Sequence, residues 1–267
     1  MAIYTSSSKL FSHQRQSKIY EMVQERGTLS VDELVNTFTV SPMTIWRDLI
    51  ALDRAGKIKR VRGGVARIEE EGAREPFYKN KRVVNKDKKR AIARLAAQQF
   101  LQDDDIIIME AGTTAGAMIE FLTQRNLTVM TNGLGTLNDL SCYVPDITII
   151  SCGGMLRDVA YTFVGPQAEM FFRGVRANTL FLSATGMAFP EGITDPNPFE
   201  IQVKRAMVES ASRVVLLLDS SKFGLRSLLP VIPLEQVYAL VTDKGAPVEE
   251  LDKLRSKGIE VHVASYK

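Results

Sequence analysis

Two helix start signals in close succession, within residues 30–52, constrain the fold of this chain most strongly. The segment reads SVDELVNTFTVSPMTIWRDLIAL. Ser30 followed by Glu33 matches a capping box, which predicts a first short helix. Ser41 can cap a second helix, and Pro42 suits its first position, where a missing N–H costs nothing. We therefore expect two short helices joined by a tight turn.

The second of these helices has a packed face and a free face. Ile45, Leu49 and Leu52 recur at spacings of four and three residues, which indicates the packed face. The free face carries Arg, Thr, Met and Trp, which can bond to guanine or phosphate or touch a thymine methyl. This arrangement is typical of a helix-turn-helix, with an ordinary helical hairpin as the alternative. The residues expected to contact DNA here are Ser41, Met43, Thr44, Trp46 and Arg47.

A basic segment directly after the second helix predicts a β-hairpin. The Gly63-Gly64 pair, between short apolar segments, can form its turn. Residues 41–67 hold seven Lys or Arg against two Asp or Glu, and this surplus favours contact with phosphates. Of the acidic residues, Asp48 is interpreted as orienting Arg47 or a backbone group. The hairpin residues expected to contact DNA are Lys59, Arg60 and Arg62.

The formal net charge of +3 is distributed unevenly along the 267 residues. Residues 1–90 hold 19 Lys or Arg and 11 Asp or Glu, a charge of +8, which leaves 15 and 20, or −5, for residues 91–267. The basic surplus therefore belongs to the expected DNA-binding module. No apolar run approaches the roughly 20 residues of a membrane span, and the first residues lack a secretory apolar core. We expect a cytoplasmic protein that does not contact a membrane.

The chain has only two cysteines, Cys142 and Cys152, and no C-x-x-C pattern. The two histidines, His13 and His262, lie far from them in sequence. This pattern favours ordinary reduced thiols rather than a disulfide framework or a metal site. We expect neither a metal nor a cofactor.

Domain boundaries follow from a change in pattern after the hairpin. Residues 69–89 are charged, contain Pro76 and show little apolar periodicity, which indicates a linker. The predicted organisation is a winged helix-turn-helix domain of the α+β class at 13–68, a linker at 69–89 and an α/β domain at 90–267.

From Asp105 onward, short apolar runs alternate with helical stretches, which predicts a mainly parallel sheet covered by helices on both faces. Ligands of such sheets bind beyond the carboxyl ends of the strands. The predicted strands are 106–109, 129–131, 147–150, 180–182, 214–218, 238–241 and 261–263. The predicted helices between them are 114–123, 134–141, 201–212 and 247–257.

Small and polar residues follow five of these strands at the carboxyl edge. The Gly112-Thr113-Thr114 turn, for example, offers N–H and hydroxyl donors to an anion, and Thr185 follows the fourth strand. Each strand end alone is ordinary turn chemistry. Five together predict a pocket for a phosphorylated small molecule. Its positive charges would come from Arg157, Lys204 and Lys222.

The segment VSPMTIWRDLIALDRAGKIKRVRGGVA resembles the winged helix-turn-helix of the DeoR/GlpR family of bacterial transcription regulators. The motifs EAGTT, TNG, GG-x-x-R, VKRAM and DSSKFG resemble the sensor domain of the same family, so that the resemblance spans about residues 13–264. It implies a C-terminal α/β domain similar in fold to ribose-5-phosphate isomerase that binds a sugar phosphate. The effector-site residues that it implies are Glu110, Gly112, Thr113, Thr114, Asn132, Gly153, Gly154, Lys204 and Lys222.

Three positions depart from the family pattern. Trp46 stands where the family usually has an arginine, and Glu110 where it more often has aspartate. Gln202 stands where a second carboxylate is common, beside a retained Glu200. The operator sequence and the identity of the sugar therefore do not transfer to this chain.

The resemblance implies a transcriptional repressor of a carbohydrate-utilisation operon, relieved or modulated by a phosphorylated sugar, and no enzymatic activity. The expected partners are a double-stranded DNA operator, the sugar phosphate and further copies of the chain, as a dimer or tetramer, because one winged domain reads only a half-site. The alternative is a sugar-phosphate isomerase-like enzyme that carries a basic accessory domain. Its general base would be Glu110, Asp219 or Glu200.

Overall fold

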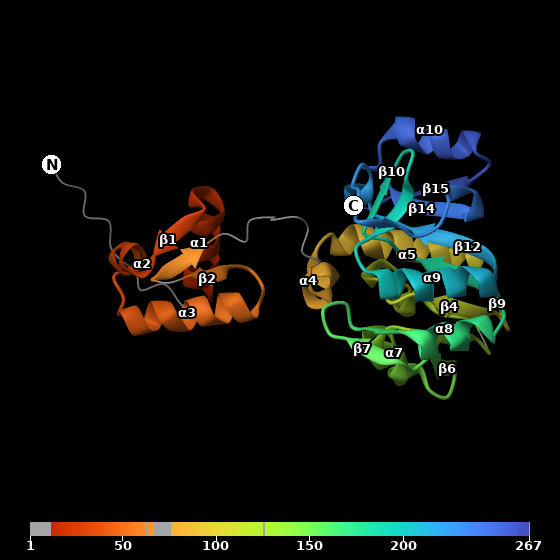
Figure 1. Ribbon diagram of the computed structural model, residues 1–267, viewed down its shortest axis with the longest axis horizontal. Coiled ribbons are helices and arrows are strands. Elements are labelled where there is room, and N and C mark those ends of the chain that lie inside the picture. The colour runs from red at the N-terminus through yellow and green to blue at the C-terminus, as the bar shows by residue number, and fades with distance from the viewer. Residues whose placement is uncertain (1–11, 62, 67–75, 125, 267) are drawn as a thin grey trace. The chain divides into compact units, whose positions relative to one another are not determined.

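The structure is a computed structural model that describes residues 12–61, 63–66, 76–124 and 126–266 (Figure 1). The chain divides into two compact units, Met1–Arg74 and Glu75–Lys267. The elements of the first unit are α1 (Ser12–Arg26), β1 (Thr28–Ser30), α2 (Val31–Phe38), α3 (Pro42–Arg54), β2 (Lys59–Val61) and β3 (Gly64–Ala66).

The predicted helix-turn-helix is confirmed, and its end groups are satisfied as the sequence indicates. Ser30 Oγ accepts a hydrogen bond from the Glu33 amide at 3.1 Å, and the Glu33 carboxylate accepts one from the Ser30 amide at 2.7 Å. Thr39 ends α2 in the left-handed conformation, with a φ of 52°. Ser41 caps α3, and Pro42 occupies its first turn. Both helices therefore begin at the predicted residues.

The predicted hairpin is also confirmed, and it belongs to a three-stranded antiparallel sheet in the order β1-β3-β2. Gly63 forms the turn with a φ of +80°, a conformation that disfavours other residues. Gly64 pairs so closely with β1 that an added Cβ would lie 2.2 Å from the Leu29 carbonyl oxygen. A core formed by all three helices and the sheet holds this unit together; its fully buried members include Ile19, Leu34, Ile45, Leu49 and Val65.

One interpretation of the sequence is wrong. Asp48 does not orient Arg47; it is 2% exposed and turns toward α1, where it accepts hydrogen bonds from Arg15 Nε at 2.5 Å and from Gln16 Nε2 at 3.0 Å. Asp48 lies next to Leu49 on the packed side of α3, so its carboxylate meets α1 rather than solvent. This buried pair fixes how α1 supports α3.

The second unit is built on a seven-stranded sheet in the order β15-β14-β12-β9-β4-β5-β6, in which every neighbouring pair is parallel. All seven predicted strands are confirmed as its members. They are β4 (Ile106–Met109), β5 (Thr128–Thr131), β6 (Thr148–Ser151), β9 (Ala177–Leu182), β12 (Ala211–Leu217), β14 (Ala239–Asp243) and β15 (Glu260–Ala264).

Helices cover both faces of this sheet, as predicted, because successive strand residues face opposite cores. Ile107 and Met109 pack with α5 and α7, whereas Ile108 packs in the core that contains α8, α9 and α10. The helices are α4 (Tyr78–Val83), α5 (Lys86–Phe100), α6 (Thr113–Gly116), α7 (Leu134–Leu140), α8 (Pro166–Arg173), α9 (Pro198–Ser210) and α10 (Val248–Ser256). The shorter strands are β7 (Met155–Arg157), β8 (Thr162–Val164), β10 (Gly186–Ala188), β11 (Gly192–Asp195) and β13 (Leu229–Pro230).

Two predicted ranges differ from the structure. The helix expected at 114–123 is only the short α6 followed by a 3-10 helix at Ala117–Phe121. Residues 78–89, predicted as the second part of a linker, instead form α4 and the first turn of α5 within the second unit. The first part, 69–75, lies outside the described residues. Tyr78 is buried and gives this segment an anchor in the domain.

We expect Asp48→Ala to destabilise the DNA-binding unit by about 3 kcal/mol, because a buried guanidinium then loses this counter-charge. The matched control is Asp53→Ala, which removes the exposed partner of Arg60 and should cost less than about 1 kcal/mol. Chemical denaturation of the full chain, followed by the fluorescence of Trp46, measures both. Equal losses in the two variants would contradict the role assigned to Asp48.

Candidate functional site

The first candidate site is the free face of α3. Met43 is 63% exposed, and Ser41 and Arg47 are also exposed. The Ser41 and Thr44 hydroxyls lie 2.9 Å apart and are hydrogen-bonded at the start of the helix. Trp46 differs from these residues, because it is only partly exposed and packs against the hydrophobic core of the unit. The predicted DNA-contacting residues therefore share one face, with Trp46 at its packed border.

The hairpin adds basic side chains beside this face. Lys59 is exposed on β2, whereas Arg60 Nε donates to Asp53 Oδ2 at 3.0 Å. This ion pair lies in solvent and contributes little stability, so Arg60 can exchange Asp53 for a phosphate at low cost. Arg62, the third predicted hairpin residue, lies outside the described residues.

The second candidate site lies where the strand order of the large sheet reverses. From β4 the chain proceeds outward to β5 and β6, and then returns to place β9 on the other side of β4. A crevice at such a switch point, beyond the carboxyl ends of the strands, is the common ligand position in open α/β sheets. Glu110 follows β4 and Ser183 follows β9, so both lie at this point.

A buried lysine joins the strand ends there. Lys204 of α9 is 4% exposed, and its Nζ donates to Asp195 Oδ2 at 2.6 Å and to the Ser183 carbonyl at 2.8 Å. Glu110 Oε1 lies 3.3 Å from the same nitrogen. Glu110 Oε2 accepts from the amides of Gly112 at 2.9 Å and Ser183 at 3.3 Å. The constellation thus connects β4, β9, β11 and α9.

The charges in this constellation perturb one another. Burial alone would lower the pKa of Lys204, but the carboxylates of Asp195 and Glu110 outweigh it and raise that pKa, so the lysine stays charged. Burial raises the pKa of Glu110; Lys204 opposes this shift, while Asp195 adds to it. Lys204 Nζ therefore pairs mainly with Asp195, at the shorter distance, and less closely with Glu110.

A second ion pair lies on the same helix. Glu200 Oε1 accepts from Arg157 Nη1 at 2.6 Å and from Thr162 Oγ1 at 2.8 Å. Arg157 is the last residue of β7, so this contact fixes the β7-β8 hairpin against α9. Glu200 and Lys204 are four residues apart on α9, so this helix contacts Arg157 of β7 as well as Asp195 at the end of β11.

Other predicted residues take supporting positions. Asn132 is buried, and its Oδ1 accepts from the Ala111 amide at 3.1 Å, which links the ends of β4 and β5. The Thr185 amide donates to Asp195 Oδ1 at 2.8 Å. Gly153 and Gly154 both have positive φ, and they form the turn between β6 and β7. Thr113 and Thr114 open α6 directly after Gly112.

Lys222 belongs to a separate cluster at the ends of β12 and β14. Its amide donates to the Asp219 carbonyl at 3.0 Å. Asn85 Nδ2 donates to Asp219 Oδ1 at 3.0 Å, and Lys88 Nζ donates to Ser220 Oγ at 2.7 Å. This cluster ties the junction of α4 and α5 to the sheet edge.

Comparison with known proteins gives the same division of the chain. A DeoR-like helix-turn-helix domain model matches residues 15–71, and a DeoR C terminal sensor domain model matches residues 84–244. The chain belongs to the DeoR family of transcriptional regulators. The HTH-type transcriptional regulator YulB of Bacillus subtilis is 34% identical over 248 residues, which cover 93% of this chain and 95% of YulB.

A second relative of this DeoR-family regulator is the glycerol-3-phosphate regulon repressor of Escherichia coli. It is 31% identical over 251 residues, 94% of this chain and 98% of the repressor. Among solved structures, ribose 5-phosphate isomerase A of Methanocaldococcus jannaschii gives a TM-score of 0.37 at 17% identity, over 52% of this chain and 55% of that chain.

Sequence reasoning missed several polar residues of the DeoR sensor domain. Asp195 receives the shortest contact of Lys204, and Thr136 and Ser183 carry buried hydroxyls without a hydrogen-bond partner among the described residues. The available signal for Asp195 was its place in the GITDPNP segment, where a short apolar run ends at an acidic residue before a helix start. Thr136 and Ser183 gave no signal, because isolated hydroxyls are common in turns.

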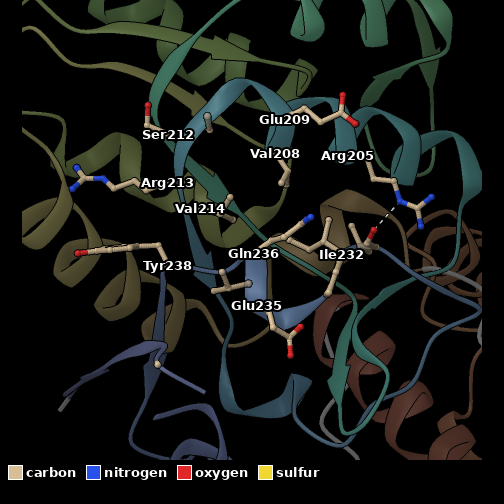
Figure 2. A pocket seen from close by; sticks show the side chains of 15 residues that line it. Arg205, Val208, Glu209, Ser212, Arg213, Val214, Ile232, Glu235, Gln236 and Tyr238 are labelled. Atoms are coloured by element: carbon tan, nitrogen blue, oxygen red, sulfur yellow. Dashed lines mark hydrogen bonds between the residues drawn. The ribbon is translucent and has the colours of Figure 1, made fainter. Parts of the chain in front are cut away.

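A groove of about 710 Å³ lies elsewhere, at the amino end of β12 (Figure 2). Its two arginines are already engaged: Arg205 donates to the carbonyls of Val231 and Pro230, and Arg213 donates to Thr179 and the Phe100 carbonyl. Figure 2 also shows Glu209 and Glu235 in its wall. The groove therefore suits an anionic effector poorly, and the switch point remains the better site.

The described residues contain no group of three or more His, Cys, Asp or Glu side chains arranged to hold a metal ion. None of their helices is long and apolar enough to cross a bilayer.

We expect Lys204→Met to destabilise the sensor domain by about 3–5 kcal/mol at neutral pH, because Asp195 and Glu110 then stay buried without their cation. Removing Lys204 takes away the charge that opposes the raised pKa of Glu110, so the folded variant binds a proton that the unfolded chain has released. Its stability is therefore highest below the ordinary carboxyl pKa and falls as pH rises.

Denaturant unfolding between about pH 5 and pH 8 measures this difference, which should be smaller at the lower pH. Lys257→Met is the control, since Lys257 pairs with Glu235 in solvent and should cost little at either pH. A stability loss for Lys204→Met that does not depend on pH would contradict this account.

Proposed function

We propose that this DeoR-family regulator represses a carbohydrate-utilisation operon in the cytoplasm, and that a phosphorylated sugar bound in the sensor domain relieves or modulates the repression. The observation that carries the proposal is the buried polar constellation at the switch point, on the same chain as a basic helix-turn-helix. Regulation requires that the sugar bind one conformation better than another, by about 1–3 kcal/mol in typical cases.

The proposed effector site has parts that suit both ends of a sugar phosphate. Buried carboxylates such as Glu110 can accept hydrogen bonds from sugar hydroxyls. Amides, hydroxyls and lysines suit the phosphate. The proposed effector-binding residues are Glu110, Gly112, Thr113, Thr114, Asn132, Gly153, Gly154, Arg157, Thr185, Lys204 and Lys222. The printed name of the E. coli relative, a glycerol-3-phosphate regulon repressor, supports a small phosphorylated effector.

The contacts of Glu110 favour this reading over a sugar-phosphate isomerase. Its Oε2 accepts from the amides of Gly112 and Ser183, and its Oε1 lies 3.3 Å from Lys204 Nζ. A general base needs a free oxygen directed at a substrate proton. Glu110 has both oxygens engaged in holding the strand ends, which supports a binding role without turnover.

The decisive experiment uses the full-length protein and an operator selected by it from random DNA. We expect at least one of glycerol 3-phosphate, ribose 5-phosphate, fructose 6-phosphate and glucosamine 6-phosphate to change operator affinity about 5- to 100-fold. The unphosphorylated sugars and inorganic phosphate serve as controls. Electrophoretic mobility shift and calorimetry measure the two equilibria. Failure of all four compounds to bind would overturn the sensor assignment, and turnover of one of them would favour the enzyme.

The exposed residues of α3 allow a separate test of base recognition. Arg47→Ala should weaken binding to the selected operator by about 1–3 kcal/mol and weaken binding to random DNA much less, because Arg47 is placed to read a base. Lys59→Ala is the matched control, since loss of a phosphate contact weakens both complexes alike and reduces their salt dependence. Fluorescence anisotropy at several salt concentrations measures this. If Arg47→Ala weakens binding to the operator and to random DNA equally, Arg47 contacts phosphates rather than bases.

Half-site reading also supports an oligomer. One winged domain covers one half-site, so we propose a homodimer or tetramer on DNA, with the two half-sites related by symmetry.

A further inference from the structure

Tyr78, the first residue of α4, connects the beginning of the sensor unit to the proposed effector site. The unit starts at Glu75, so Tyr78 is one of its first residues after the DNA-binding unit. The Tyr78 amide donates to the Val159 carbonyl at 2.8 Å, and its ring stacks on Tyr161 with centroids 5.6 Å apart. The backbone and ring of Tyr78 are therefore held by the domain, whereas its hydroxyl takes no part in these contacts.

The Tyr78 hydroxyl lies over the glycines of α6 and α7. A Cβ added at Gly135 would lie 2.5 Å from Tyr78 Oη, and one added at Gly116 would lie 3.9 Å from it. Both glycines thus leave room for the tyrosine tip. No hydrogen-bond partner of Tyr78 Oη occurs among the described residues, although the side chain is only 7% exposed. Burial raises the pKa of Tyr78, so the phenol stays protonated and can donate.

A second hydroxyl faces the same place from the body of the domain. Thr136 of α7 is fully buried, and its Oγ1 has no partner in the described part of the chain. Thr136 Oγ1 lies 3.9 Å from the Cβ position of Gly116, the same distance as Tyr78 Oη. A buried hydroxyl without a partner costs free energy, so Thr136 Oγ1 beside the Tyr78 hydroxyl indicates a place for a polar ligand.

The rest of α4 and its junction with α5 contact α7 and the sheet edge. Arg82 pairs with Asp139 of α7 at 2.7 Å, and Asn85, with a φ of 55°, donates to Asp219 at the end of β12. α4 has six residues and no side-chain cap, and its Lys81 carbonyl accepts from Lys89 Nζ. A ligand that bonds to Tyr78 therefore adds a contact at the first residue of α4.

We propose that Tyr78 transmits effector occupancy to the DNA-binding domain: an oxygen of the bound sugar phosphate bonds to Thr136 in both conformations of the regulator and to Tyr78 only in the conformation that the effector favours. This inference rests on the proposed function of the site. Tyr78 is suited to the task because α4 follows the connection between the two units directly, whereas Thr136 lies within the folded domain.

Thermodynamic linkage predicts different effects on effector affinity for two variants, Tyr78→Phe and Thr136→Val. The ratio of effector affinities with and without operator equals the ratio by which the effector changes operator affinity. Tyr78→Phe keeps the ring but removes a hydrogen bond that the effector makes in only one conformation. It therefore lowers only one of the two effector affinities measured with and without operator. The ratio between these affinities falls by the same factor. Thr136→Val removes a bond made in both, so it lowers both affinities and leaves the ratio unchanged.

The experiment measures effector affinity by calorimetry for the full-length protein, alone and saturated with its selected operator. The probes are glycerol 3-phosphate, ribose 5-phosphate, fructose 6-phosphate and glucosamine 6-phosphate. We expect a loss of about 3- to 10-fold for each removed hydrogen bond. Tyr238→Phe is the control, because it removes a hydroxyl that donates to Glu260 at 2.8 Å near the amino end of β14, and it should change neither affinity.

Hydrogen exchange of the wild-type protein gives a measurement that needs no variant. The amides of α4 should exchange more slowly when the effector is bound, and an unchanged rate would overturn the proposal. Equal loss of both affinities in Tyr78→Phe, or no loss, would also overturn it. If the wild-type protein binds none of the four compounds, the proposed function itself fails. If the wild-type protein binds one of them and Tyr78→Phe binds it with unchanged affinity, only the role of Tyr78 fails.

Discussion

The sensor domain depends on one buried cation. Lys204 joins a carboxylate beyond β4, a carboxylate at the end of β11 and a carbonyl beyond β9, so it fixes three strand ends that hydrophobic packing alone would leave adjustable. Two carboxylates and an ammonium are expensive to remove from water, and only their mutual pairing offsets that cost. The same pairing fixes the polar groups at the switch point relative to one another.

The DNA-binding unit uses the same principle on a smaller scale. Asp48 is the buried polar residue of α3, and its contact with Arg15 of α1 fixes the orientation of the recognition helix. The apolar core could tolerate small rotations of α3, whereas a hydrogen-bonded ion pair tolerates few. In both units a buried ion pair therefore fixes secondary-structure elements relative to one another.

The sequence predicted the regular part of this architecture because each signal was local. Capping at Ser30 and Ser41 and the seven apolar runs depend on neighbouring residues, and all of them form the expected elements. The pairs that build the site join residues distant in sequence, such as Glu110 and Lys204, so no local pattern identifies which residues meet. The same holds for Asp48 and Arg15 in the DNA-binding unit. The segment with α4 looked like a linker because one buried tyrosine, Tyr78, anchors it among charged residues.

Two of the three departures from the family pattern, Trp46 and Glu110, acquire a physical meaning in this structure. Trp46 packs partly against the core, so its indole does not occupy the position of an exposed arginine, whereas Met43 and Arg47 on the same helix are exposed. Glu110 uses its extra methylene to fold back, with one oxygen on the Gly112 amide and the other near Lys204. A shorter aspartate could not span both contacts in the same way. The longer side chain therefore connects the turn after β4 to Lys204 of α9.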